Sequence, residues 1–556
     1  MKVSKKLVLK SLLVVLLLIV MLPGCAKYAR DTKLPTADSR PNFLLVVVDD
    51  MGYTDLGSFG GEIETPNIDA LANAGVRFTD FHVSVSCSPT RSMLLSGTDN
   101  HLAGMGTMSE LVHPWQKGKP GYETHINDRV VTLPELLRNG GYHTYMAGKW
   151  HLGHDKGNRP YDRGFEKTYS LMNGGASHYS DMNPLFEADM IIYTKNGQQI
   201  DTLPGDFFSS RSYADFLMNS IRENRGDGKP FFAYLSFTAP HDPMHVPEPW
   251  RTKYKGKYAD GYEALRNKRV EGSKKAGVFA ENVAVTERHP LVKPWSSLTE
   301  QDKAWQQAQM EVYAGMVDNL DYHFGRVITF LKDIGEYDNT VIIFFSDNGS
   351  APADSEDYPG NREGDFLKQF DNSVDNIGNR NSHSAYGIGW AQAGSGPLDL
   401  FKMAVGEGGI RSPLIVSGPD IKGDGGFNRN FSYITDIMPT MLELAGLQHP
   451  EQFEGRDIQP LRGHSIVKSL NNSKKSIYNS DEYVGGEMFD GRWLRKGDYK
   501  AILVPKPFGD SQWRLFNVVV DPGETNDLAK EKPNLLQELQ QAWDRYADEV
   551  GVVLPP

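Results

Sequence analysis

Cysteine is nearly absent from the sequence, since the 556 residues include only Cys25 and Cys87. Each of the two has another predicted task, described below, although the first residues of the chain indicate export to a compartment where disulfides form. We therefore expect no structural disulfide.

Long hydrophobic runs and an excess of positive charge are also missing. The apolar run at residues 12–22 is too short to span a bilayer, but after four lysines it is typical of a secretory signal. We expect a signal peptide at residues 1–24, whose removal takes the formal net charge from -12 to -16. So acidic a surface argues against a nucleic-acid partner.

The sequence contains no internal repeat, no low-complexity tract and no Gly-x-Ser-x-Gly motif, and the last absence disfavours a serine hydrolase. Its hydrophobic content of 39% is that of an ordinary globular protein. At 556 residues, the chain is long enough for a large domain and a smaller one.

A continuous apolar run opens the globular part. Residues 42–48 are rich in β-branched side chains, which is typical of a strand buried on both faces in a parallel sheet, and the run stops at Asp49 and Asp50. Two adjacent carboxylates repel each other unless a cation lies between them, and open α/β sheets bind ligands at this end of their strands. Alternatively, the pair begins a turn, which Gly52 would permit.

A second copy of this pattern favours the ligand hypothesis. Helical spacing over residues 310–335 precedes a strand pattern at 340–345, and Asp347 and Asn348 follow. A helix followed by a parallel strand brings these side chains to the same sheet edge as the first pair. Such an all-oxygen cluster suits a hard cation, calcium or magnesium, and not zinc; we prefer calcium because no nucleotide site is evident.

The stretch from residue 87 to 97 reads Cys-Ser-Pro-Thr-Arg-Ser-Met-Leu-Leu-Ser-Gly. Ser88 as N-cap, Pro89 and Gly97 predict a short helix with Cys87 just before its positive end, where anions bind, and Arg91 one turn in. The usual alternative for a lone cysteine is a small buried hydrophobic residue.

Basic side chains also follow strand patterns. Lys149 and His151 come after residues 142–147, and His241 comes after residues 230–237. Taken singly, each is more often a solvated lysine or a hydrogen-bonded core histidine, and His151-x-x-His154 alone is a weak metal signal.

Together, Cys-x-Pro-x-Arg and the following Leu-Leu-Ser-Gly resemble the motif of the type I sulfatases, closest to the bacterial arylsulfatase branch of the alkaline phosphatase superfamily. The resemblance implies that Cys87 is oxidised to Cα-formylglycine by a formylglycine-generating or sulfatase-maturating enzyme. It implies one calcium ion, held by Asp49, Asp50, the residue formed from Cys87, Asp347 and Asn348. It also implies a sulfate ester substrate, with sulfate-binding and proton-transfer residues at Arg91, Lys149, His151, His241 and Lys402, the last just upstream of Gly408-Gly409.

The implied reaction is hydrolysis of a sulfate monoester, of arylsulfatase type, to inorganic sulfate and an alcohol or phenol. One hydroxyl of hydrated formylglycine attacks sulfur, activated by Asp347, and either His241 or Lys402 protonates the leaving group. Deprotonation of the second hydroxyl by His151 then expels sulfate. Two alternatives stay open: a phosphonate monoester or phosphodiester hydrolase of the same superfamily, and a non-catalytic, lipid-anchored protein that binds sulfated ligands.

The predicted fold is α/β, with a large, mostly parallel central sheet flanked by helices, as in alkaline phosphatase. Residues 492–503 and 513–520 predict strands, and a helical pattern follows to residue 550. We expect a catalytic domain at 41–460 and, at 461–556, a C-terminal subdomain with an antiparallel sheet and a helix.

The end of the signal, Leu22-Pro-Gly-Cys25, resembles a bacterial lipoprotein box. It implies an exported bacterial lipoprotein, periplasmic or in the cell envelope, anchored in a membrane by lipidation of Cys25 and a tether at residues 25–40. Ordinary signal cleavage, with an incidental Cys25, is the alternative.

Residues 251–295 and 349–400 predict lids or specificity loops. For His101, two alternatives stay open: a place at the mouth of the substrate site or a structural role.

Overall fold

The computed structural model describes residues 40–419, 421 and 425–556. The predicted signal peptide, Cys25 and residues 25–39 of the predicted tether lie outside this range. Residues 40–225 and 230–556 form one compact unit.

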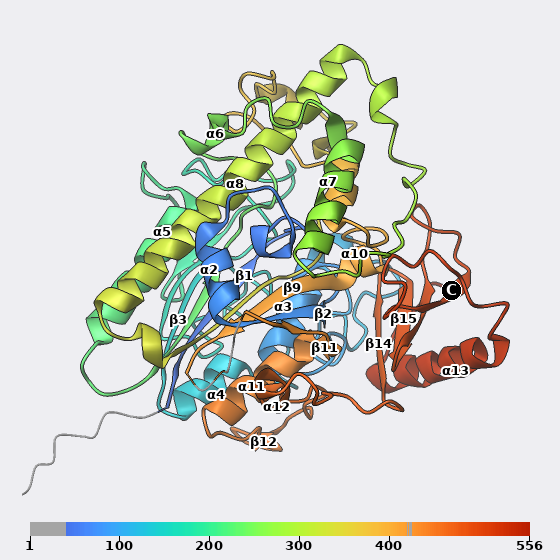
Figure 1. Cartoon of the computed structure of the whole chain (residues 1–556). Helices are drawn as coiled ribbons and strands as arrows, with labels where there is room; N and C mark the ends of the chain where they lie inside the picture. Colours follow the sequence, from blue (N-terminus) through green and yellow to red (C-terminus); the bar gives the residue numbers. More distant parts are fainter. Residues whose placement is uncertain (1–39, 420, 422–424) are drawn as a thin grey trace, which may run out of the picture. The chain divides into compact units, whose positions relative to one another are not determined.

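A large mixed sheet forms the centre of this unit (Figure 1). Its strands run in the order β10 (Phe427–Asn428), β2 (Val76–His82), β9 (Arg411–Ser417), β8 (Thr340–Ser346), β1 (Asn42–Val48), β7 (Phe231–Ser236), β3 (His143–Lys149), β4 (Lys167–Leu171), β5 (Tyr193–Lys195) and β6 (Gln198–Ile200), with β11 (Ser432–Tyr433) also paired to β2. The neighbours of β1 and of β3 are parallel, whereas β9 is antiparallel to both of its neighbours.

Strand β1 is buried along its whole length because both faces of the sheet are covered. Phe43, Leu45 and Val47 belong to one hydrophobic core, and Leu44 and Val46 belong to the other. This alternation is the period of two that a strand imposes on its side chains. The predicted bounds of 42–48 are confirmed.

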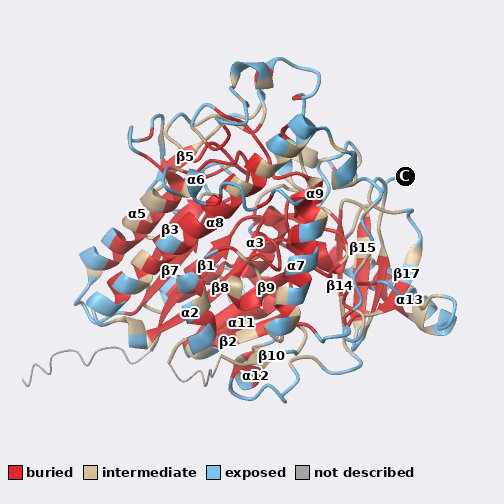
Figure 2. Cartoon of the chain, turned by 45° about the horizontal axis from the view of Figure 1, so that its top comes forward, coloured by how far each residue is buried: buried red, intermediate tan, exposed pale blue. Residues whose placement is uncertain are grey.

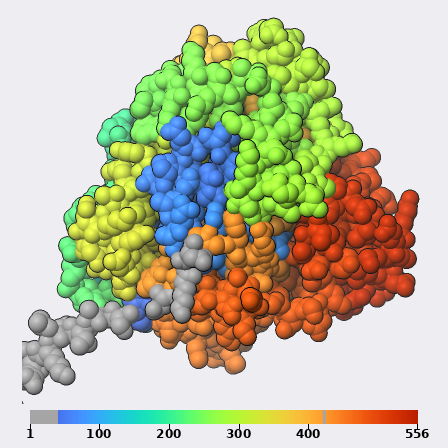
Figure 3. Space-filling model, viewed as in Figure 1, coloured from blue at the N-terminus to red at the C-terminus, as the bar shows by residue number. Residues whose placement is uncertain are grey.

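Helices cover the sheet on both faces (Figure 2). One core is completed by α2 (Pro66–Ala74), α5 (Ser209–Asn224), α7 (Gly261–Lys275), α8 (Glu300–Asp333) and α9 (Ile388–Ser395). The other is completed by α3 (Cys87–Ser96), α4 (Leu133–Asn139), α11 (Ile437–Leu444) and α12 (Val467–Asn471). The short helices α6 (Trp250–Lys253) and α10 (Glu407–Ile410) lie in connections. In Figure 3, the blue segment that carries α2 reaches the surface between green α7 and yellow α8.

The C-terminal part forms a separate antiparallel sheet beside α13 (Pro533–Val550). Its strands, in order, are β14 (Tyr483–Met488), β15 (Gly491–Lys496), β16 (Tyr499–Leu503) and β17 (Trp513–Asn517). One face packs Leu494 and Leu515 against Trp543 of α13, while Trp493 and Ile502 on the other face join the core beneath the central sheet. A small hairpin, β12 (Gln452–Phe453) with β13 (Arg456–Asp457), precedes this sheet.

The predicted fold class is therefore confirmed, and the boundary at residue 460 stays a prediction. In the described part of the chain, no helix combines the length and hydrophobicity needed to cross a membrane.

Candidate functional site

One edge of the central sheet collects the predicted site residues, and strand direction explains how. The parallel strands β1, β3, β7 and β8 all end at this edge. Asp49 follows β1, Lys149 is the last residue of β3, His241 lies after β7, and Asp347 follows β8. Because β9 is antiparallel, its first residue lies at the same edge, and the segment before it brings in Lys402.

Cys87 is the first residue of α3, and its side chain is only 2% exposed. The N-cap is Ser86, which has an extended backbone, so the predicted cap at Ser88 is wrong and Ser88 lies in the first turn with Pro89. Gly97 ends the helix in the left-handed conformation (φ 65°), as predicted. The Cys87 side chain therefore lies at the positive end of the helix dipole.

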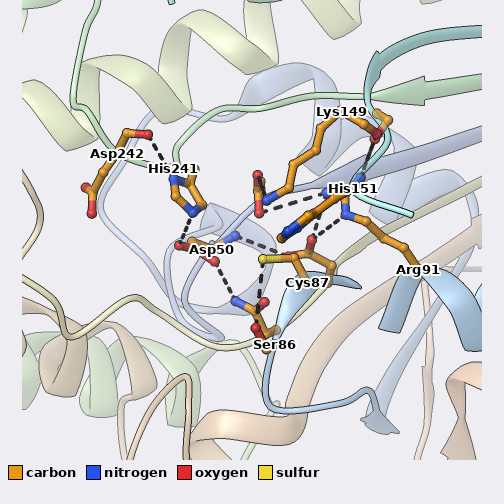
Figure 4. A network of polar contacts seen from close by, with 12 residues as sticks. Asp50, Ser86, Cys87, Arg91, Lys149, His151, His241 and Asp242 are labelled. Atoms are coloured by element: carbon orange, nitrogen blue, oxygen red, sulfur yellow. Dashed lines mark hydrogen bonds and ion pairs between the residues drawn. The ribbon is translucent and has the colours of Figure 1, made fainter. Parts of the chain in front are cut away.

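Carboxylates and ammonium groups surround the Cys87 sulfur (Figure 4). Ligand atoms of Asp49, Asp50, Cys87 and His241 all lie within 4.8 Å of one another. The Nζ atom of Lys402 lies 3.6 Å from Cys87 Sγ and 2.6 Å from Asp50 Oδ1. In Figure 4 the imidazole of His241 points toward Asp50, at 3.5 Å from Nε2 to Oδ2.

The thiol of Cys87 is acidic in these surroundings. Burial alone raises its pKa, but the positive charges of Lys149 and Lys402 outweigh burial and hold the pKa well below the usual value. A negatively charged group is thus favoured where this side chain ends.

Arg91, one turn into α3, is fully buried against Asp347. Its NH2 atom lies 2.7 Å from Asp347 Oδ2, and its NH1 atom donates to the carbonyl oxygen of Lys149 at 3.0 Å. Lys149 in turn lies 2.7 Å from Asp49, between its Nζ atom and Oδ2. The predicted contact of Arg91 with sulfate oxygens stays a prediction.

The oxygen cluster fits a hard cation. Asp49 Oδ1 and Asn348 Oδ1 are buried oxygens without a hydrogen-bond partner, which is costly in a protein interior. Burial raises the pKa of Asp347 to about 6, and repulsion from Asp49 adds to this effect. A cation at these oxygens would relieve both costs, and carboxylate and amide oxygens are the ligands that calcium prefers.

A cavity of about 530 Å³ opens onto this cluster. Four predicted site residues line it: Cys87, His151, His241 and Lys402. The chemical groups at its floor are thus accessible to a ligand although each is largely buried.

A family model described as sulfatase matches residues 41–447, and one described as the C-terminal part of N-sulphoglucosamine sulphohydrolase matches residues 400–548. The chain belongs to the type I sulfatase family. It is a sulfuric ester hydrolase.

Curated relatives agree with this assignment. An uncharacterized sulfatase of Schizosaccharomyces pombe is 43% identical over 93% of this chain and 95% of its own length. An arylsulfatase of Klebsiella aerogenes is 39% identical over 77% of this chain and 91% of its own length.

Solved structures share the fold. Ps i-CgsB in complex with k-i-k-neocarrahexaose has a TM-score of 0.64 at 22% identity, covering 91% of this chain and 93% of that one. BT4656 in complex with its substrate D-glucosamine-2-N,6-O-disulfate has a TM-score of 0.58 at 21% identity, covering 92% and 98%.

Two groups that contact the histidines of this sulfatase were not predicted from the sequence. Glu110 Oε1 lies 3.3 Å from His151 Nε2, and His178 Nε2 lies 2.9 Å from the carbonyl oxygen of His241. No strand or helix pattern in the sequence marks either Glu110 or His178.

His101 has the structural role among its two predicted alternatives. It is fully buried between Asp99 and Glu487, at 3.0 Å from each carboxylate, and it does not line the cavity.

Proposed function

We propose that this enzyme hydrolyses sulfate monoesters by way of a formylglycine formed from Cys87, with one calcium ion. The observation that carries the proposal is the position of Cys87: its sulfur lies at a helix N-terminus, 3.6 Å from the ammonium of Lys402, at the floor of the cavity. A buried structural cysteine needs neither paired cations nor access from a cavity.

Calcium is proposed at Asp49, Asp50, Asp347 and Asn348, with the oxygen that replaces the Cys87 sulfur. The unpartnered oxygens of Asp49 and Asn348 support this ligand set. When bound, the ion supplies positive charge that favours a sulfate oxygen and the oxygen of residue 87.

The hydrated aldehyde supplies a hydroxyl that attacks sulfur and a second hydroxyl whose deprotonation releases sulfate. Residues of the chain stabilise charge and transfer protons in these two steps. Lys149 and Lys402 offset the negative charge of the sulfate, and Lys402 or His241 donates a proton to the departing oxygen. His151, held by Glu110, accepts the proton of the second hydroxyl.

Oxidation of Cys87 removes one sulfur and two hydrogens and adds one oxygen, with the oxidising equivalents supplied through the maturation enzyme. The test is the mass of the Cys87 peptide, measured on enzyme from a host that contains such a maturation enzyme, together with sulfate release from 4-nitrophenyl sulfate. We expect activity proportional to the converted fraction.

Cys87→Ala is the matched control, because it removes the sulfur and leaves the helix. It should lack sulfate release and should retain the denaturation midpoint within a few degrees. Activity in a sample whose Cys87 is wholly unmodified would contradict the formylglycine step.

Sulfate release that survives calcium chelation would contradict the calcium proposal. A faster release of 4-nitrophenol from bis(4-nitrophenyl) phosphate or from 4-nitrophenyl phenylphosphonate than from 4-nitrophenyl sulfate would favour the alternative of a phosphonate monoester or phosphodiester hydrolase.

We also propose that the enzyme is an exported bacterial lipoprotein, periplasmic or in the cell envelope, with Cys25 as its lipid anchor. The support is the sequence Leu22-Pro-Gly-Cys25 after an apolar run. Labelled palmitate should be incorporated by the full chain and not by Cys25→Ser. Equal recovery of both in the soluble fraction would contradict the anchor.

A further inference from the structure

The walls of the cavity are far more apolar than its floor. Beyond Cys87, His151, His241 and Lys402, most of the lining is aliphatic, aromatic or proline: Met108, Leu111, Leu185, Phe186, Leu291, Ala351, Pro352, Ala353, Pro359, Ile388, Met403, Pro507 and Phe508. Several of these side chains are only partly buried, and Leu291 is 48% exposed. Apolar side chains left open around a reactive centre mark a binding surface.

These walls come from distant parts of the sequence. Phe508 belongs to the C-terminal part, and its ring packs edge-on against Phe401, at 5.2 Å between centroids. Its carbonyl oxygen lies 3.1 Å from His289 Nε2, on the loop that also carries Leu291. The apolar side chains of the cavity walls are thus held in place by contacts between distant segments. One of these side chains, Met403, directly follows Lys402 in the sequence.

The polar side chains of the walls are few and mostly engaged elsewhere. Among the described residues that line the cavity there is no arginine, asparagine, glutamine, serine or threonine. Glu110 faces His151, Asp189 accepts from Asn173 at 2.8 Å, and Asp357 pairs with Arg362 at 2.7 Å. The Tyr358 hydroxyl donates to Asp242 at 3.0 Å.

This lining offers few hydrogen-bond partners to the hydroxyl groups of a sugar. These hydroxyls lose water on entering the cavity, and an unpaired hydroxyl in an apolar site costs affinity. The exceptions among the wall residues are Asp354 and Glu110, whose Oδ1 and Oε2 atoms are buried without a hydrogen-bond partner. The charge of the walls also disfavours a second anionic group on the substrate. Glu110 and Asp357 are paired with cations, but Asp189 and Asp354 form no ion pair among the described residues, so their carboxylates repel such a group.

We propose that the natural substrates are sulfate esters of uncharged, predominantly apolar alcohols or phenols larger than one benzene ring. The inference rests on the proposed function and narrows its substrate class. The cavity volume of about 530 Å³ is several times the roughly 150 Å³ of an apolar protein cavity that binds benzene, so the cavity holds far more than a sulfate group. The remaining volume takes the apolar part of the ester.

The test is kcat/KM for phenyl sulfate and its 4-methyl, 4-propyl, 4-butyl and 4-hexyl derivatives, measured on enzyme with converted Cys87. Alkyl groups barely change the acidity of the phenol, so the chemistry of the leaving group is constant. We expect an increase of about fourfold for each methylene that is fully buried, until the cavity is filled. A flat or falling series overturns the inference.

Two matched pairs test charge and polarity. 4-(2-Carboxyethyl)phenyl sulfate has one heavy atom more than the butyl derivative, and its kcat/KM should be at least about a hundredfold lower. Hexyl sulfate and galactose 6-sulfate are both esters of primary alcohols, and hexyl sulfate should be preferred at least about tenfold. A preference for the carboxylate or for the sugar overturns the inference.

Variants locate the effect in the walls. Phe508→Ala should reduce the gain from phenyl to 4-butylphenyl sulfate about tenfold, and Leu291→Ser, at an exposed position that tolerates substitution, should reduce it less. Val520→Ala, on the C-terminal part but 74% exposed, is the control and should leave the gain unchanged. An unchanged gain in both wall variants overturns the inference. Turnover of phenyl sulfate shows whether the proposed function holds, independently of the substrate preference. If no sulfate ester is turned over, both the proposed function and this inference are overturned.

Discussion

Glu110 shows how a single side chain adjusts its neighbour. Burial lowers the pKa of His151, but the charge and hydrogen bond of Glu110, together with a hydrogen bond to Cys87, outweigh burial, and the net pKa of His151 is raised. Glu110 itself has its pKa lowered to about 2: burial opposes this shift, and His151 more than compensates.

Glu110→Gln should therefore lower the pKa of His151. Because His151 accepts a proton in the proposed mechanism, activity increases as pH rises through its pKa, and the acid limb of the kcat/KM profile should move to lower pH in the variant. Removal of the carboxylate also makes the neutral imidazole a weaker base, so we expect kcat on the plateau to fall about tenfold.

The control is Asp357→Asn, which changes another carboxylate of the cavity wall and should leave the acid limb in place. An acid limb that moves equally in both variants would show a general electrostatic effect in place of the Glu110–His151 pair.

Among the elements, α8 is the longest helix of the described residues, with 34 residues, and it begins with a capping box. Thr299 Oγ1 accepts from the backbone N–H of Asp302 at 3.1 Å, and the Asp302 carboxylate accepts in return from Thr299. Thr299→Ala should cost about 1 kcal/mol of unfolding free energy. Denaturant titration monitors this loss, with the exposed Ser297→Ala as control; equal midpoints for all three proteins would contradict the role of the cap.

Prediction of elements succeeded where burial dictates the pattern. The interiors of strands β1 and β8 are apolar because helices cover both faces of the sheet, and the sequence pattern predicted the bounds of β1 to the residue and those of β8 to within one residue. Helix α8 was predicted from residue 310, ten residues late, since its first turns are largely polar and have no apolar stripe. Strand β14 was missed because Gly485 and Gly486 interrupt its pattern.

The candidate site was predicted unevenly for the same kind of reason. Residues such as Asp50 and Lys149 follow or end strand patterns in the sequence. The sequence alone therefore predicts that they meet at one edge of the sheet. Phe508 reaches the cavity only through packing of the C-terminal part, and no local pattern reports such a contact.

At the scale of the whole molecule, a buried ion cluster ties the C-terminal sheet to the segment that carries Lys402. Lys500 of β16 lies 2.8 Å from Glu407 and 3.1 Å from Glu524. Glu524 Oε2 accepts the backbone N–H of Glu407 at 2.7 Å. Burial raises the pKa of Glu524 to about 8, although Lys500 lowers it, so its carboxyl is mostly neutral at pH 7.

Two substitutions in this cluster should therefore differ sharply. Lys500→Met leaves Glu407 without one of its buried cations and should cost about 3 kcal/mol. Glu524→Gln retains an acceptor for the N–H of Glu407 and removes little charge at pH 7, so it should cost less than about 1 kcal/mol. Unfolding in urea at pH 7 compares them, and equal losses would contradict the neutral state of Glu524.

His101 links the catalytic and C-terminal parts in a pH-dependent way. Its imidazole lies between Asp99 of the segment after α3 and Glu487 of β14, and Asp99 also accepts from Tyr546 of α13 at 2.7 Å. Burial lowers the pKa of His101, but its hydrogen bonds to Asp99 and Glu487 raise it to about 9. The folded state thus holds a proton on His101 that the unfolded chain releases near its ordinary pKa of 6.5.

A raised pKa stabilises the fold at low pH: the contribution of His101, about 3 kcal/mol, is complete below pH 6.5 and is lost as pH rises through 9. The denaturation midpoint of His101→Gln should accordingly lie furthest below that of the unsubstituted enzyme at pH 6, and the gap should narrow by pH 9.5. His154→Gln, at an exposed histidine, is the control and should show no such trend. A gap that is constant from pH 6 to 9.5 would mean that His101 joins the two parts by packing alone, because only a proton held between the two carboxylates gives the pH dependence.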